Sequence, residues 1–73
     1  MINITNKEYG DFIYNNVLPK LKIKDLNKSN IDDVYDFIVE EYEITYIKNK
    51  DPRLKFINAL LNYLAQFMDF VEQ

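Results

Sequence analysis

The carboxylates between residues 31 and 47 are the densest group of side chains in this chain that could perform chemistry. This stretch holds six acids and no base. At 100° per residue, five of the six fall on a strip about 100° wide along one helix. They are Asp32, Asp33, Asp36, Glu40 and Glu43. Carboxylates set close together can transfer protons, bind cations or attract a basic partner.

Catalysis and metal binding lack the other residues that they need. The chain has no histidine and no cysteine, and these two residues carry most general-base, nucleophilic and transition-metal chemistry. The acids lack the spacing and the loop glycine of a calcium-binding EF-hand. With Gly10 as the single glycine, there is no glycine-rich phosphate loop. We therefore predict no enzyme activity, no catalytic residue, no metal site and no cofactor.

The acidic strip then has two interpretations. Charged strips on helices usually form a solvated outer face. The alternative is an electrostatic docking surface for a basic protein, including mimicry of a nucleic-acid backbone. Eight lysines against one arginine, with abundant Asn, Ile and Tyr, suggest an AT-rich genome, and under the second interpretation we expect a phage or a mobile element to encode the protein.

A second candidate surface lies on the segment 52–71, which is apolar on too many sides to pack against one neighbour. Its polar residues share a strip about 80° wide, which leaves an apolar arc of about 240°. Four aromatic residues cluster within this arc, namely Phe56, Tyr63, Phe67 and Phe70. Either they pack against the other helices, with this segment as the central element, or they remain open for a second copy or another protein.

Two smaller features complete the set of candidate sites. Phe37 and Ile44 are seven residues apart, so they share one side of a straight helix, where they either contact the first helix or form a second, exposed apolar spot. A basic patch is formed by Lys20, Lys22, Lys24 and Lys28. Because the second helix is acidic and the third is too apolar to enter a DNA groove, nucleic-acid binding ranks last.

The elements that must position these residues are three helices, at about 6–18, 30–48 and 52–71. Thr5 and Glu8 have the spacing of a capping box, which predicts that the first helix begins directly after Thr5. Pro19 predicts a kink there or an end near Val17. Residues 19–28 are predicted to be a loop or a last helical turn.

The second helix is predicted to begin after Ser29 or Asn30 as the N-cap. Its apolar stripe continues through 44–47, so this β-branched run is predicted to be helical although a strand is the alternative. Asp51 and Pro52 predict the start of the third helix, with Asp as the N-cap and Pro in the first position.

Length and composition set the architecture. A chain of 73 residues with 48% hydrophobic residues can form one globular core, so we predict a single all-α domain, 1–73, folded as a three-helix bundle. The N-terminus lacks the features of a secretory signal. Five polar residues interrupt the most apolar stretch, 54–71, so no membrane span is expected. We expect a cytoplasmic protein.

The sequence therefore predicts a small non-enzymatic protein that binds a protein partner, with a regulatory or adaptor role and self-association as a homodimer through the third helix. The alternative is an acidic inhibitor that blocks a basic or nucleic-acid-binding site on an enzyme. A nucleic-acid-binding helical module is the third hypothesis. The sequence does not specify the identity of the partner.

Overall fold

The computed structural model describes residues 2–68 and contains three helices in that range, which confirms the all-α three-helix bundle. Helix one consists of α1 (Lys7–Phe12), the π-helical turn η1 (Ile13–Val17) and α2 (Leu18–Leu21). Helix two consists of α3 (Ile31–Ile38), the π-helical turn η2 (Val39–Glu43) and α4 (Ile44–Asn49). Helix three is α5 (Leu54–Ala65).

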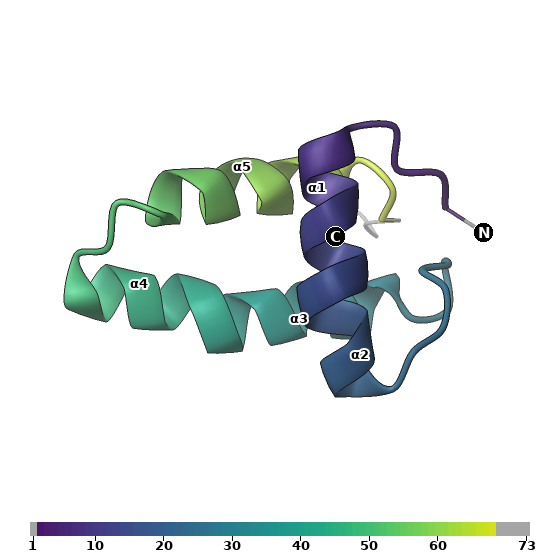
Figure 1. Cartoon of the computed structure of the whole chain (residues 1–73), viewed down its shortest axis with the longest axis horizontal. Helices are drawn as coiled ribbons and strands as arrows, with labels where there is room; N and C mark the ends of the chain where they lie inside the picture. Colours follow the sequence, from purple (N-terminus) through teal and green to yellow (C-terminus); the bar gives the residue numbers. More distant parts are fainter. Residues whose placement is uncertain (1, 69–73) are drawn as a thin grey trace, which may run out of the picture.

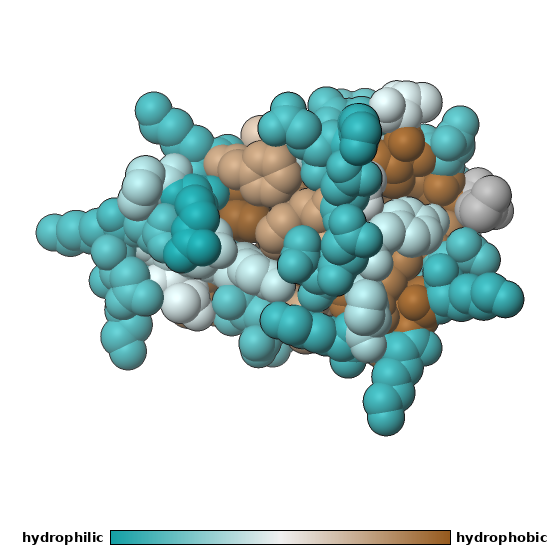
Figure 2. Space-filling model, viewed as in Figure 1, coloured by the Kyte–Doolittle hydropathy of each residue, from teal (hydrophilic) through white to brown (hydrophobic). Residues whose placement is uncertain are grey.

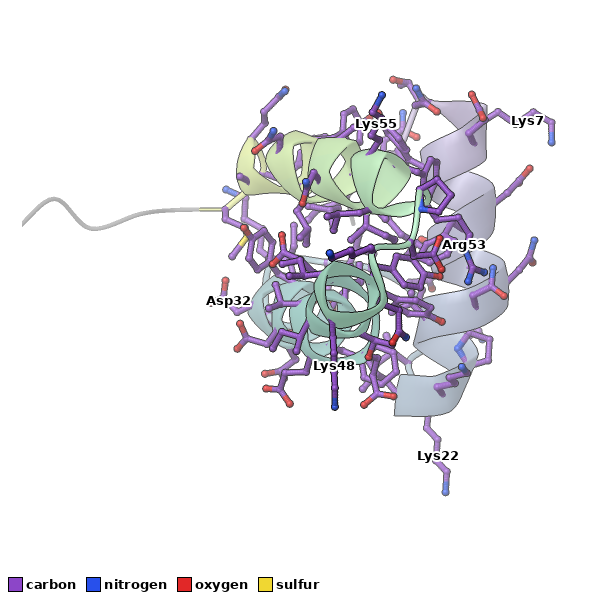
Figure 3. All side chains as sticks on the ribbon, turned by 90° about the vertical axis from the view of Figure 1, so that its left-hand side faces the viewer. Lys7, Lys22, Asp32, Lys48, Arg53 and Lys55 are labelled. Carbon is purple, nitrogen blue, oxygen red and sulfur yellow. The ribbon has the colours of Figure 1, made fainter. Side chains whose placement is uncertain are left out.

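Helices two and three lie side by side and antiparallel, and helix one crosses this pair at a steep angle (Figure 1). Seen along the axes of the pair, helix one covers one side of it (Figure 3). Among the described residues, no helix covers the opposite side of the pair. The fold therefore has two layers of helices, and helix two keeps an outer surface that no other helix contacts.

Helix one begins one residue later than the capping box predicted. Its N-cap is Asn6, whose side-chain oxygen accepts the N–H of Tyr9 at 3.1 Å. Thr5 does not cap the helix, and its N–H donates to the hydroxyl of Tyr63 at 3.3 Å. Asn and Thr are both good N-caps, and the contact with helix three decides between them here.

Pro19 does not end helix one, which continues to Leu21. A proline ring normally clashes with the carbonyl of the fourth residue before it. The wider π turn directly before the proline, marked by the bond from the Leu18 N–H to the Ile13 carbonyl, opens the helix at this point. The helix then ends at Lys22, which has the left-handed conformation with a φ of 57°.

Helix two starts after Asn30, as predicted, but the side chain of Asn30 does not cap it. That side chain instead accepts the N–H of Asn27 at 2.9 Å and donates to the carbonyl of Asp25 at 2.9 Å, which holds the preceding loop. Residues 44–47 are helical, as predicted. The helix ends at Lys50, a second left-handed residue, with a φ of 54°.

Helix three is shorter than the predicted range of 52–71. Asp51 and Pro52 form a turn before it, and the helix runs from Leu54 to Ala65. After Ala65 the backbone bonds shorten to the i to i+3 type, as between Phe67 and Leu64 at 3.0 Å, which tightens the last turns. Hydrophobic periodicity reports which side of a helix is buried but not this change in bonding. Residues 69–71 lie outside the described residues.

The core gathers aliphatic side chains from all three helices and from two non-helical segments. Those exposed by 2% or less are Ile13, Val17, Leu18, Leu26, Ile31, Val34, Ile38, Ile57, Leu60 and Leu64. The N-terminal segment also contributes, because Ile2 is buried and its N–H donates to the carbonyl of Leu26 at 3.0 Å. No described polar or charged residue is buried.

Candidate interaction surface

The acidic strip predicted on helix two is present in part. Asp32, Asp33, Asp36 and Glu40 are all exposed. Glu43 is only half-exposed and does not continue the strip. The prediction assumed 100° per residue along the whole helix, and the π turn η2 breaks that assumption.

The π turn changes which side chain follows Glu40 on the outer surface. In η2 the N–H of Ile44 donates to the carbonyl of Val39, five residues earlier, instead of four. This adds about one residue to the turn and rotates everything after it by about 100°. Ile44 therefore takes the direction that Glu43 would have in a straight helix.

Two isoleucines that follow the π turn are exposed. Ile44 is 55% exposed, and Ile47, one turn later, is 57% exposed. They are the two large hydrophobic residues that stand out among the described residues as exposed. Ile47 was not predicted as a site residue. A signal for it was present, because Ile47 lies about 160° from Ile31 on a straight helix and so falls off the apolar stripe.

Phe37 and Ile44 do not form the predicted joint apolar spot. The same rotation separates their directions by about 100° more than in a straight helix. Phe37 is half-buried and packs on Tyr42, with the ring centres 6.4 Å apart. This contact spans five residues, a spacing that a π turn brings together and a regular α-helix does not.

Four residues form a row on the outside of helix two, and we call it the outer row. It consists of Asp36, Glu40, Ile44 and Lys48, spaced four residues apart. All four are exposed, and residues four apart lie above one another on a helix. Lys48 points directly away from helix three in Figure 3. Neither Glu40 nor Lys48 has an ion-pair partner within residues 2–68.

The aromatic face predicted on helix three meets helix one inside the same chain. Phe56 packs on Tyr9 and Phe12, with ring centres 5.6 and 5.4 Å apart. Tyr63 packs on Tyr9 at 5.1 Å and on Phe67 at 5.3 Å. All five rings are half-buried. The fourth predicted member of this face, Phe70, lies outside the described residues.

The rings continue from helix one onto helix two. Phe12 contacts Tyr42 at 5.1 Å, and Tyr42 contacts Tyr46 at 6.0 Å. Apolar side chains gather beside helix one, in the angle between α5 and α4 (Figure 2). Helix one thus covers part of this surface, and the rings hold it to the antiparallel pair.

Cations cover the helix-two end of this row of rings. The Lys20 ammonium lies 5.7 Å from the centre of the Tyr42 ring, and the Arg53 guanidinium lies 4.7 Å from that of Tyr46. Arg53 also donates to both carboxylate oxygens of Asp51, at 3.0 and 2.6 Å. This hydrogen bonding holds the pKa of Asp51 below its usual value and raises that of Arg53. The group closes the turn into helix three.

The predicted basic patch lies around the end of helix one. Lys20, Lys22, Lys24 and Lys28 are exposed. Lys20 also donates to the hydroxyl of Tyr42 at 3.5 Å, so it is partly engaged within the chain. Lys22 ends the helix in the left-handed conformation and points away from the bundle (Figure 3).

Within residues 2–68 the structure has no pocket and no group of three or more potential metal ligands. None of the described helices has the length and apolar character needed to cross a lipid bilayer. Comparisons with models of protein families, with curated proteins and with solved structures give no match to this chain.

Proposed function

We propose that this protein is a non-enzymatic binding protein that contacts another protein through the outer surface of helix two. This surface consists of the outer row together with Asp32 and Ile47. The sequence supports binding rather than catalysis, because it lacks histidine and cysteine. The proposal places the protein in the cytoplasm, a reducing compartment with which a cysteine-free chain is compatible.

The observation that carries the proposal is the exposure of Ile44 and Ile47 among charged residues. Isoleucine is one of the residues most often buried, and each of these side chains would gain roughly 1 kcal/mol from losing its contact with water. Acids line one side of the pair, and charged groups around an apolar centre are the usual arrangement of a protein interface. A partner would offer an apolar contact bordered by basic groups.

The aromatic face of helix three is the less suitable surface for this role. Phe56 and Tyr63 already pack on Tyr9 and Phe12 of helix one. A second copy bound there would compete with these contacts or cover only the remaining half of each ring. We therefore place the binding surface on helix two.

Site-specific photo-crosslinking tests the proposal. A photoreactive amino acid is introduced at Ile47 and, as a matched control, at Asn16, an exposed residue of helix one. We expect protein adducts in source cells from position 47 and not from position 16. Unlabelled wild-type protein should suppress these adducts, whereas the Ile44→Asp variant should not. Equal labelling from both positions, or equal competition by Ile44→Asp, would contradict the proposal.

The exposed acids favour a second candidate, an acidic inhibitor that occupies a basic site on an enzyme. Asp32, Asp36 and Glu40 point into solvent along one side of helix two, where they can attract such a site. The two candidates differ in the residue they need. An inhibitor that works through charge should lose binding on Asp36→Lys with Glu40→Lys, lose it at high salt, and keep it on Ile44→Asp.

A further inference from the structure

The outer row carries opposite charges four residues before and four residues after an apolar residue. Glu40 lies four residues before Ile44, and Lys48 lies four residues after it. At 1.5 Å per residue, Lys48 stands about 6 Å along the helix from Ile44, and Glu40 stands somewhat closer because the π turn lies between them. The π turn η2 lies between Glu40 and Ile44, and both residues are exposed on the outer side of helix two.

A row of this kind is complementary to itself when it is turned end for end. In an antiparallel pair of helices, Ile44 meets Ile44 of the second copy, and Glu40 meets Lys48 of the second copy on both sides. A two-fold axis through Ile44 relates the two halves. Contacts that repeat in this way define an isologous interface, the commonest type in homodimers.

The remaining charges of helix two agree with this arrangement. Antiparallel pairing about Ile44 sets Asp36 just beyond the end of helix two of the second copy, which is at Lys50. The acidic first turn of helix two in each copy then lies beyond the last turn of helix two in the other copy. The carboxylates of the two first turns therefore do not face one another. A parallel pair would place like charges opposite each other along the whole row, which is destabilising.

From this charge pattern we infer that the partner of the outer row is a second copy of this chain, bound antiparallel with Ile44 at the two-fold axis. The inference rests on the proposed function, since it names the occupant of the same surface. The contact is one helix against one helix, which is below the usual size of a stable interface. The dimer is therefore weak and reversible, and it depends on salt because its ion pairs are exposed.

Sedimentation equilibrium from about 10 µM to about 1 mM at low salt, with charge-swapped variants, tests the inference. Glu40→Lys and Lys48→Glu each place two like-charged pairs in the dimer, so each should weaken dimerisation by about tenfold or more. The double variant restores both pairs and should dimerise within about threefold of wild type. Both residues are exposed, and circular dichroism checks that each variant is folded.

Mixing the two single variants gives the sharpest result. The Glu40→Lys variant still has Lys48, so both of its charges are positive. The Lys48→Glu variant still has Glu40, so both of its charges are negative. Each repels itself, but together they form two opposite-charge pairs. We expect the mixture to form a heterodimer at concentrations where either variant alone is a monomer.

Three outcomes would overturn the inference. One is a wild-type monomer throughout the range, another is a dimer with equal affinity in all variants, and the third is a mixture that stays monomeric. If such a result accompanies crosslinks from position 47 to a foreign protein that depend on Ile44, the proposed function stands and only the identity of the occupant is wrong. If neither a copy nor another protein is crosslinked, both are wrong.

Discussion

At the scale of single residues, two lysines occupy positions where glycine is the usual choice. Lys22 and Lys50 both have a positive φ and end a helix. After Lys50 the N–H of Asp51 donates to the carbonyl of Tyr46 at 2.9 Å, which is the bond of a glycine-type helix end. A side chain with a Cβ in this conformation costs about 1 kcal/mol, so both positions store strain.

Replacing Lys50 by glycine should therefore stabilise the fold. We expect Lys50→Gly to raise the free energy of unfolding by about 0.5–1 kcal/mol, because the strain is lost. The matched control is Lys55→Gly, at an exposed lysine inside α5, which should lower it by about 0.5–1 kcal/mol. Urea denaturation followed by circular dichroism measures both. A loss of stability in both variants would contradict the assigned conformation of Lys50.

At the scale of elements, the two π turns determine how helices one and two present their side chains. In helix one, η1 lets Ile13 and Leu18, five residues apart, both be buried at 1% exposure or less. In helix two, η2 brings Phe37 against Tyr42 and turns Ile44 outward. A π turn is equivalent to one extra residue in an α-helix, so each can be tested by changing the length of the chain.

Deleting Glu41, an exposed residue of η2, should convert helix two into a continuous α-helix. The segments on either side keep their directions, because the deletion removes the extra residue. We expect the free energy of unfolding to stay within about 1 kcal/mol of wild type. Inserting one alanine after Glu41 is the control.

That insertion rotates α4 by a further 100° or so and moves Tyr42 and Tyr46 away from Phe12 and Arg53. It should lower the free energy of unfolding by about 2 kcal/mol or more. Chemical denaturation of both variants makes the comparison. Equal losses from deletion and insertion would show that η2 is not an extra residue in an otherwise regular helix.

At the scale of the whole molecule, the N-terminal segment joins parts of the chain that are distant in sequence. Ile2 is buried at 7% exposure and donates its N–H to Leu26. The N–H of Leu26 donates in turn to the hydroxyl of Tyr14 at 3.3 Å, and Thr5 donates to Tyr63 on helix three. This segment therefore helps to hold helix one across the antiparallel pair.

Removing the side chain of Ile2 should destabilise the whole fold. We expect Ile2→Ala to lower the free energy of unfolding by about 2 kcal/mol, the lower end for a buried isoleucine because the segment is near the terminus. Asn3→Ala, at the exposed neighbouring position, should change it by less than about 0.5 kcal/mol. Thermal unfolding of the three proteins at one concentration measures the difference. Similar values for both variants would mean that Ile2 is not part of the core.

The sequence by itself was sufficient for the fold class, for the helical state of residues 44–47 and for helix starts near Asn6, Asn30 and Asp51. These features depend on local causes, chiefly hydrophobic periodicity and the polar or turn-forming residues that interrupt it, although the predicted capping side chains of Thr5, Asn30 and Asp51 do not cap the helices. The acidic residues Asp32, Asp33, Asp36 and Glu40 were placed on one exposed side for the same reason. For Pro19 the sequence left two alternatives, a kink or an end near Val17, and the structure continues the helix to Leu21. The end of α5 at Ala65 was not predicted.

The tertiary structure decided which side chains share the outer surface of helix two. A straight helix places Glu43 in the acidic strip and Ile44 beside Phe37, whereas in the structure Glu43 is half-exposed and Ile44 follows Glu40 on the outer surface. It also decided that helix one meets the aromatic face of helix three. The physical reason is that a π turn and a helix crossing are selected by packing between distant segments, and a periodic pattern within one segment carries no record of that packing.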